Sequence, residues 1–233
     1  MKKLCIKKNI FITSTGTNLG KTYCLVEILK ELAKKKIMAN GYKPILSGFN
    51  SNNIADSDSY KILQTRNIIP DINLIKEITP WLFKSPIAPS IAAMKEKKTL
   101  KYKEVLKWCL EKSNKSGINI FEGAGGIYVP IEGKKTILNL MQELECKVVL
   151  IVGNYLGSVS HTISAIKNIQ HENIEIINVI INKNTDNNIN IQDTENLINS
   201  VFNPKIKIRK VFQNDNSANI SFKKITDDIL SSF

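Results

Sequence analysis

The sequence predicts an α/β protein in which helices cover both faces of a doubly wound, mostly parallel sheet, in one domain spanning residues 1–233. Three observations lead to this prediction. Short apolar segments alternate along the chain with longer segments of helical periodicity. Several of the apolar segments are continuous, which is typical of parallel strands buried on both faces. A length of 233 residues suits one sizeable domain with its own core.

The first strand and the first helix enclose a glycine-containing turn. Residues 10–13 are apolar and β-branched, and residues 22–36 lack Gly and Pro and carry Leu and Ile at helical spacing. Between them, the run Thr-Gly-Thr-Asn-Leu-Gly-Lys-Thr occupies residues 15–22. Such a turn presents backbone N–H groups and a helix N-terminus to an anion. We therefore predict a nucleotide phosphate-binding loop, with Lys21 at the terminal phosphates and the Thr22 hydroxyl on Mg²⁺.

The remaining elements continue the alternation. A second strand is predicted at residues 38–44, continued by 45–48, and a helix at 56–66 begins with acidic residues that suit a helix N-terminus. A proline-rich stretch follows, and it leads into helices at 91–94 and 101–112. In the second half, strands are predicted at 118–122, 147–152, 174–182 and 206–212, and helices at 136–145, 158–170, 193–201 and from 222 onward. The asparagine-rich residues 182–190 predict a surface loop.

Composition narrows the class of protein. The net charge of +12 allows a nucleic-acid partner, but the lysines are dispersed and no aromatic-basic platform accompanies them, so we expect anionic small substrates and no nucleic acid. No apolar run is long enough to span a membrane, and the N-terminal apolar run is too short for a secretion signal. The cysteines are scattered without zinc or disulfide spacing, which favours the cytoplasm: Cys5, Cys24, Cys109 and Cys146.

The candidate site residues follow the ends of predicted strands, and these ends share one edge of a parallel sheet. The segments concerned are residues 13–22, 43–47, 122–126 and 153–157, together with Asn182. We therefore expect them to converge in space.

Their chemistry suits phosphoryl transfer. Mg²⁺ prefers hard oxygen ligands, which Thr22, Asp58 and Glu122 would supply, although Asp58 is equally well explained as a helix cap. Lys43 is either a solvated loop lysine or a second cation beside Lys21. Two such cations would offset the repulsion between a γ-phosphate and an anionic nucleophile, each by about 4 kcal/mol at ~4 Å.

These residues resemble the dethiobiotin synthetase family, the ATP-dependent enzymes of biotin synthesis with a P-loop NTPase-like fold. Six stretches carry the resemblance up to about residue 182: 15–22, 41–48, 56–58, 85–89, 122–126 and 156–161. The most specific are Gly-Tyr-Lys-Pro-Ile-Leu-Ser-Gly at residues 41–48 and Glu-Gly-Ala-Gly-Gly at residues 122–126.

The resemblance implies a homodimeric ATP-dependent cyclo-ligase. An amine of 7,8-diaminononanoate captures CO₂ as a carbamate, the carbamate attacks the γ-phosphate of ATP, and the second amine closes a cyclic urea and expels phosphate. The carbamate is already anionic, so its attack needs no strong general base.

The resemblance also implies a role for each matching residue. Catalytic roles fall on Lys43, Lys21 and Thr17, and Mg²⁺ ligation on Thr22, Asp58 and Glu122. The residues implied to bind nucleotide are Asn18, Leu19, Gly20, Lys21, Thr22, Tyr23, Asp58, Glu122, Gly123, Ala124, Gly125, Asn182 and Lys183, with a second adenine contact near residues 214–219. The residues implied to bind the diamine substrate are Thr17 and Ser47, with Gly157, Ser158, Val159 and Ser160 of the partner subunit for its carboxylate.

The sequence departs from the family at several positions, and two other functions stay open. Ser14 stands where the family's loop usually begins with glycine, Gly16 and Asn18 replace acidic residues, and Ser160 replaces a frequent asparagine. A regulatory ATPase of the deviant phosphate-loop type would carry another lysine near the start of the loop. A GTPase switch would need an aspartate one residue before Asp186 to complete its guanine-reading motif.

Overall fold

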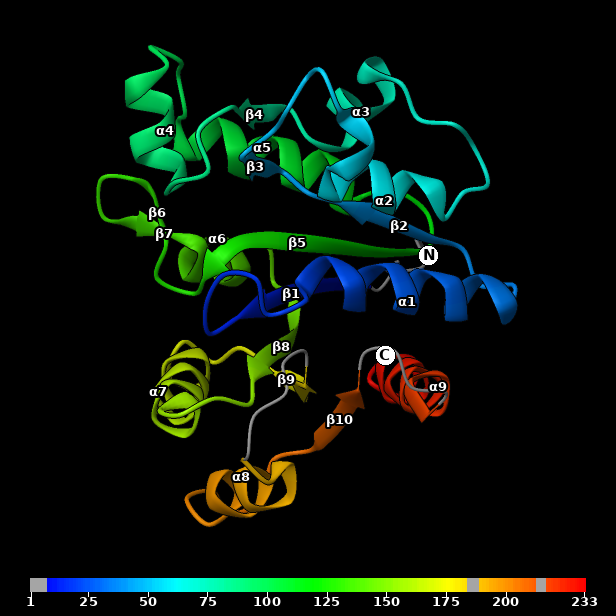
Figure 1. Ribbon diagram of the computed structural model, residues 1–233, viewed down its shortest axis with the longest axis vertical. Helices are drawn as coiled ribbons and strands as arrows, with labels where there is room; N and C mark the ends of the chain where they lie inside the picture. Colours follow the sequence, from blue (N-terminus) through cyan, green and yellow to red (C-terminus); the bar gives the residue numbers. More distant parts are fainter. Residues whose placement is uncertain (1–7, 184–188, 213–216) are drawn as a thin grey trace, which may run out of the picture.

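The computed structural model describes residues 8–183, 189–212 and 217–233 (Figure 1), with side chains of the last segment described from residue 220. Six strands form its main sheet, and every pairing described in that sheet is parallel. Their order across the sheet is β10 (Ile208–Phe212), β9 (Ile176–Lys183), β8 (Lys147–Gly153), β1 (Asn9–Ser14), β5 (Ile118–Gly126) and β2 (Ala39–Tyr42). The predicted doubly wound α/β fold is confirmed.

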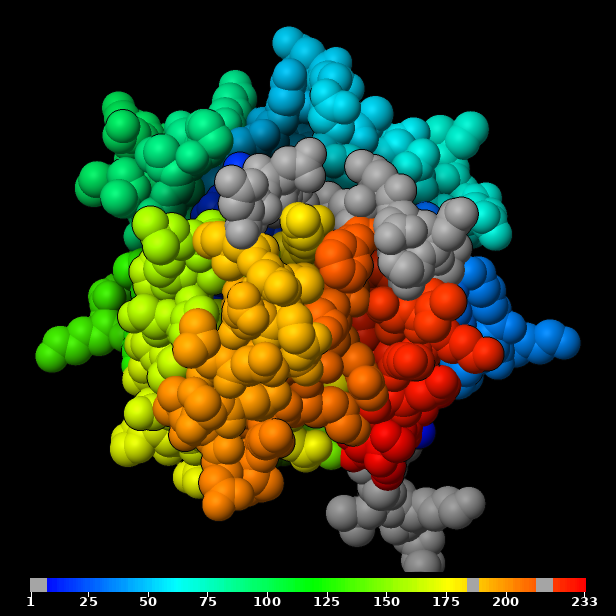
Figure 2. Space-filling model, turned by 60° about the horizontal axis from the view of Figure 1, so that its bottom comes forward, coloured from blue at the N-terminus to red at the C-terminus, as the bar shows by residue number. Residues whose placement is uncertain are grey.

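Helices cover both faces of this sheet. On one face α1 (Lys21–Lys34) packs between α9 (Ser217–Ser231) and α2 (Asp58–Gln64). The other helices are α3 (Ile72–Ile78), α4 (Pro89–Lys95), α5 (Tyr102–Ser113), α6 (Ile137–Glu143), α7 (Ser158–His171) and α8 (Ile191–Asn199). Figure 2 shows the surface formed by α7, α8 and α9, coloured from yellow-green to red, and α9 packs against the edge strand β10.

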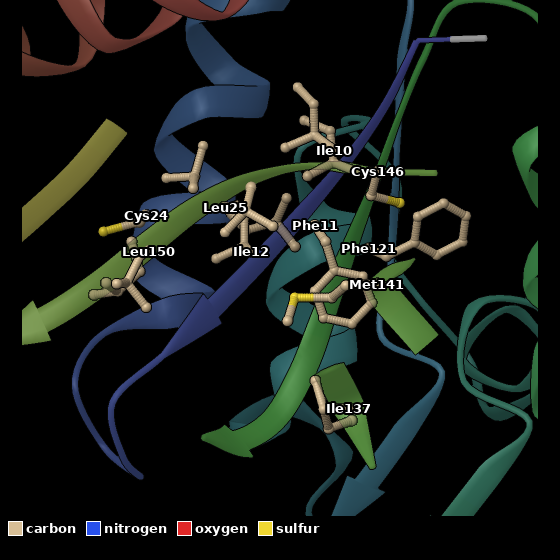
Figure 3. Close-up of a cluster of buried hydrophobic side chains, with 14 of the residues drawn as sticks. Ile10, Phe11, Ile12, Cys24, Leu25, Phe121, Ile137, Met141, Cys146 and Leu150 are labelled. Carbon is tan, nitrogen blue, oxygen red and sulfur yellow. The ribbon is translucent and has the colours of Figure 1, made fainter. Parts of the chain in front are cut away.

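The core fills the space between the sheet and its helices. Residues of β1 point to both faces, and Figure 3 shows Phe11 and Ile12 among side chains from α1, β5, α6 and β8. Both are fully buried, as is Phe121 on the neighbouring strand. Each buried side chain of this size contributes about 1.5–3 kcal/mol. The strand that leads into the phosphate-binding loop is therefore among the most firmly held parts of the molecule.

Several boundaries differ from the predicted ones for identifiable reasons. The helix predicted from residue 56 begins at Asp58 as α2, because the Ser57 side chain caps it by accepting from the Tyr60 N–H at 3.2 Å, after a 3₁₀ turn at Ile54–Asp56. The prediction that β5 breaks at Gly123 is wrong, since the strand continues to Gly126 and pairs there with Ser14. Helix α9 begins five residues before the predicted start at Phe222.

Three small features were not predicted. Helix α3 begins at Ile72, and the Asp71 carboxylate caps it at 2.9 and 2.8 Å from two N–H groups. Residues 45–48 were predicted to continue the second strand, but that strand ends at Tyr42, and β3 (Ile45–Ser47) pairs instead with β4 (Trp81–Phe83) in a separate two-stranded parallel sheet. The third feature is a hairpin in which β6 (Pro130–Glu132) pairs with β7 (Lys135–Thr136). Strands of two or three residues are too short for their sequence pattern to identify them. Within the described part of the chain, no helix combines the length and apolar character needed to cross a membrane.

Candidate active site

A cavity of about 680 Å³ lies at the carboxyl ends of β1, β2 and β5, beside the small β3–β4 sheet. The segments at residues 13–22, 43–47 and 122–126, which follow three different strands, therefore converge as expected. The lining residues are Thr17, Asn18, Gly20, Lys21, Thr22, Tyr23, Lys43, Ile45, Leu46, Ser47, Asp58, Pro86, Ile87, Ala88, Pro89, Glu122, Ala124, Gly125 and Val129.

The loop after β1 has the backbone expected of an anion-binding turn. Asn18 and Gly20 both have positive φ, at 58° and 89°, and α1 begins at the next residue. Gly20 is the N-cap of α1, and no side chain caps the N–H groups of its first turn. Because no capping side chain accepts from these N–H groups, they and the positive end of the helix dipole are available to an anion in the cavity.

Lys21 is folded back onto the loop that it follows. Its ammonium group donates to Ser14 Oγ at 2.9 Å and to the carbonyl oxygen of Gly16 at 3.0 Å. Burial and the charge of Lys43 together lower the pKa of Lys21 to about 8, against the opposing effect of Glu122 and Asp58. An anion such as phosphate would favour the charged form of this group.

Lys43 lies directly after the end of β2 and forms ion pairs with two carboxylates. Its ammonium group forms ion pairs with Glu122 Oε1 and, at 3.0 Å, with Asp58 Oδ2. Burial alone would lower the pKa of Lys43, but the two carboxylates raise it above its usual range. The pKa of Asp58 lies below its usual range, because Lys43 outweighs the effect of burial. Lys43 is thus a buried, ion-paired group and not a solvated loop lysine.

Thr22 and the same two carboxylates form a set of oxygen donors. The Thr22 hydroxyl donates to Glu122 Oε1 at 2.8 Å and also interacts with Asp58. Glu122 Oε2 is buried and has no partner among the described residues. Because Ser57 caps α2, Asp58 is free to face Lys43, which removes the alternative reading of Asp58 as a helix cap. Two carboxylates and a hydroxyl, with phosphate and water, fit the needs of Mg²⁺.

No group of three or more His, Cys, Asp or Glu side chains suited to a metal occurs in the described part of the chain.

Some implied site residues lie away from the cavity lining. Leu19, Gly123 and Lys183 do not line it, nor do residues 157–160 at the start of α7. Asn182 is fully buried, and its side-chain N–H donates to the Leu19 carbonyl oxygen at 2.9 Å. This hydrogen bond connects the end of β9 to the backbone of the loop before α1. The second adenine contact near residues 214–219 lies outside the described side chains.

Sequence reasoning missed the apolar wall of the cavity. Ile45, Leu46 and Val129 line it, together with residues 86–88 of the loop before α4 and Pro89, the first residue of that helix. The signal was the Pro-Ile-Ala-Pro run, which lies in a stretch that carries the resemblance but was given no role in the site. A second missed residue is Ser14, whose hydroxyl contacts Lys21.

Comparisons with known proteins identify the family of the chain. A family model described as an AAA domain matches residues 8–216. An ATP-dependent dethiobiotin synthetase BioD from Acidiphilium cryptum (strain JF-5) is 30% identical over 177 residues, covering 75% of this chain and 79% of its own. The enzyme of the same name from Clostridium botulinum (strain Alaska E43 / Type E3) is 28% identical over 213 residues, covering 89% of this chain and 92% of its own.

Solved structures share the fold. The septum site-determining protein MinD from Pyrococcus horikoshii OT3, solved as a complex with Mg-ADP, has a TM-score of 0.57 and 10% identity and covers 95% of each chain. A ParA family ATPase from Chlorobium tepidum TLS has a TM-score of 0.51 and 15% identity and covers 97% of this chain and 92% of its own. At such identities the likeness concerns the fold alone. From the family model and the sequence relatives, the chain belongs to the AAA-domain family and to the family of the dethiobiotin synthetases.

Proposed function

We propose that this protein is a cytoplasmic, single-domain, ATP-dependent dethiobiotin synthetase that converts 7,8-diaminononanoate, CO₂ and ATP to dethiobiotin, ADP and phosphate. The observation that carries the proposal is the convergence of two lysines, two carboxylates and a threonine hydroxyl on one cavity: Lys21, Lys43, Asp58, Glu122 and Thr22.

The two lysines perform the electrostatic part of the reaction. Lys21, at the start of α1, reaches the β- and γ-phosphates held by the loop N–H groups. Lys43 lies across the cavity on the segment after β2, where its charge is fixed by Glu122 and Asp58. Each ammonium group near an anionic oxygen contributes about 4 kcal/mol at ~4 Å in a partly screened site. Together they allow an anionic carbamate to approach the γ-phosphate.

The lining of the cavity suits a nucleophile that carries its own charge. Among the described residues that line it there is no histidine, and its carboxylates are engaged by Lys43 and Thr22. A carbamate needs no base at the moment of attack, so positioning and charge neutralisation are sufficient.

Thr22, Asp58 and Glu122 are the residues that would hold Mg²⁺. When bound, the ion neutralises charge on the phosphate oxygens and orients them. The buried, unpartnered Glu122 Oε2 supports its role as one of the ligands.

The other end of the cavity suits an aliphatic diamine. Ser47 Oγ is buried without a partner among the described residues and lies in the lining with Thr17, so these hydroxyls would contact the amines or the carbamate. The apolar wall formed by Ile45, Val129 and residues 86–89 would pack against the methylene chain.

The substrate carboxylate is assigned to a second subunit of a homodimer. Residues 157–160 do not line the cavity of their own chain, and Gly157 is the N-cap of α7, with φ 90° and no side-chain cap. The uncapped start of a 14-residue helix has N–H groups that suit a carboxylate.

A labelling experiment tests the proposal. The protein is incubated with diaminononanoate, labelled bicarbonate, Mg²⁺ and ATP, and the label is sought in a cyclic urea formed in step with ADP. We expect one labelled product per ADP and no turnover when the diamine is omitted. ATP hydrolysis without the diamine, or a preference for GTP, would instead favour a regulatory ATPase or a GTPase switch.

A further inference from the structure

Ser14 is the last residue of β1, and its hydroxyl is the point where three parts of the site meet. The side chain is fully buried. Its Oγ lies 2.9 Å from the Lys21 ammonium nitrogen, 3.3 Å from the Gly16 backbone nitrogen and 3.2 Å from the Gly125 carbonyl oxygen. It also contacts the Gly16 carbonyl oxygen in a short hydrogen bond. The hydroxyl thus connects the phosphate-binding loop, its lysine and the end of β5.

The hydrogen-bonding capacity of a serine accounts for these contacts. A hydroxyl has one proton and two lone pairs. Its proton goes to the Gly16 carbonyl, the nearer of the two carbonyl oxygens, and the lone pairs accept from Lys21 and from the Gly16 N–H. Every donor and acceptor site of Ser14 is therefore used. Its backbone is not among the described positions with positive φ, so the strand accommodates a serine without strain.

Lys21 has one donor more than these contacts use. An ammonium group has three N–H donors, and two of them go to Ser14 Oγ and the Gly16 carbonyl oxygen. Lys21 also lines the cavity. With two N–H groups used on the loop, the third is left for an acceptor in the cavity that Lys21 lines.

We propose that Ser14 is a positioning residue, whose hydroxyl holds the Lys21 ammonium group so that its remaining N–H meets the terminal phosphates of the nucleotide. The inference rests on the proposed function and adds to it the group that orients the phosphate-binding lysine. A glycine at this position has no hydroxyl, so in such a protein the lysine would depend on the loop carbonyl and the ligand alone.

A double-mutant cycle separates this role from a merely structural one. Ser14→Gly removes the hydroxyl without adding volume, and the affinity for a non-hydrolysable ATP analogue with Mg²⁺ is measured by titration calorimetry. We expect about tenfold weaker binding, the size expected for losing one hydrogen bond to a charged group. In a Lys21→Ala background the same substitution should change the affinity less than about twofold, because Ser14 acts through the lysine.

Two further variants complete the test. Ser14→Ala replaces the glycine variant if that variant fails to fold. Thr226→Val is the matched control, because the hydroxyl of Thr226 in α9 is also fully buried but has no hydrogen-bond partner among the described residues. The control should bind as the wild type does. Unchanged or tighter binding in both Ser14 variants, or an equal loss in both backgrounds, overturns the inference and leaves the proposed function standing. If the wild type does not bind the analogue, both fail.

Discussion

Replacing Lys43 by methionine removes the ammonium group between two carboxylates and keeps an unbranched side chain in its place. Only 5% of the Lys43 side chain and 1% of the Glu122 side chain are exposed, whereas 32% of the Asp58 side chain is. The substitution therefore leaves Glu122 as a buried charge without its counterion, while water can still reach Asp58. Breaking a buried pair in this way costs about 3–5 kcal/mol of unfolding free energy.

This loss is large against the ~5–15 kcal/mol that stabilises most domains. The second substitution Glu122→Gln should recover most of it, because a neutral amide is far less costly to bury than an uncompensated carboxylate. Neither variant should form product, because both lack the charge that we propose faces the γ-phosphate. Recovery of stability without recovery of activity distinguishes the structural part of the Lys43 role from the chemical part.

Urea denaturation of the nucleotide-free protein measures the stability, and incorporation of labelled bicarbonate measures the activity. Lys101→Met is the matched control, since Lys101 pairs with Glu132 at 3.0 Å with 58% and 39% of the two side chains exposed. A pair this exposed contributes less than about 1 kcal/mol. The reasoning is refuted if Lys43→Met is as stable as the control variant and forms product at the wild-type rate.

Two more predictions concern the scaffold. Burial alone would raise the pKa of Asp228, but hydrogen bonds from Arg209, at 2.8 and 3.0 Å, and from other neighbours hold it below its usual range. The ionised Asp228 adds roughly 1 kcal/mol to the free energy of unfolding, as expected for a partly exposed pair. This stabilisation is present above the unfolded-state pKa of about 4 and is lost as the pH falls through the lower folded-state pKa. The difference in unfolding free energy between wild type and Asp228→Asn, measured by urea titration, should thus be constant from pH 7 to about 5 and shrink at lower pH; a difference that grows there contradicts the prediction. Gly41→Val should destabilise the protein at β2 by several kcal/mol, because even a Cβ there would lie 2.8 Å from the side chains of Ile62 and Leu29. Thermal unfolding measures this loss, and an unchanged unfolding midpoint would contradict the prediction.

The phosphate-binding loop was predictable because its signals are local. A buried strand, a turn with glycine at a positive-φ position and a lysine at the start of a helix occupy consecutive residues, so Gly20 and Lys21 were placed correctly without knowledge of the rest of the chain. The Asp71 cap of α3 was an equally local signal, but the helix is only 7 residues long and was overlooked.

The cluster around Lys43 was predictable only as a possibility. The order of strands in a parallel sheet brings the ends of β2 and β5 together, but Asp58 reaches the same place from a helix start that the sequence left open as a simple cap. The apolar wall at residues 86–89 depends on the small β3–β4 sheet, whose strands are too short for their own pattern to specify.

By itself the sequence determined the alternation of strands and helices, the loop that receives phosphate and the chemical types of the groups beside it, because hydrophobic periodicity and turn chemistry are properties of neighbouring residues. Tertiary structure alone decided that Lys43 is a buried, ion-paired group, that Asn182 donates a hydrogen bond to the Leu19 carbonyl oxygen of the loop, and that Ser14 accepts one from Lys21. The physical reason is that ion pairs and hydrogen bonds depend on what lies within a few ångströms in space. Glu122, which pairs with Lys43, and Leu19, which contacts Asn182, lie 79 and 163 residues away from them in the chain.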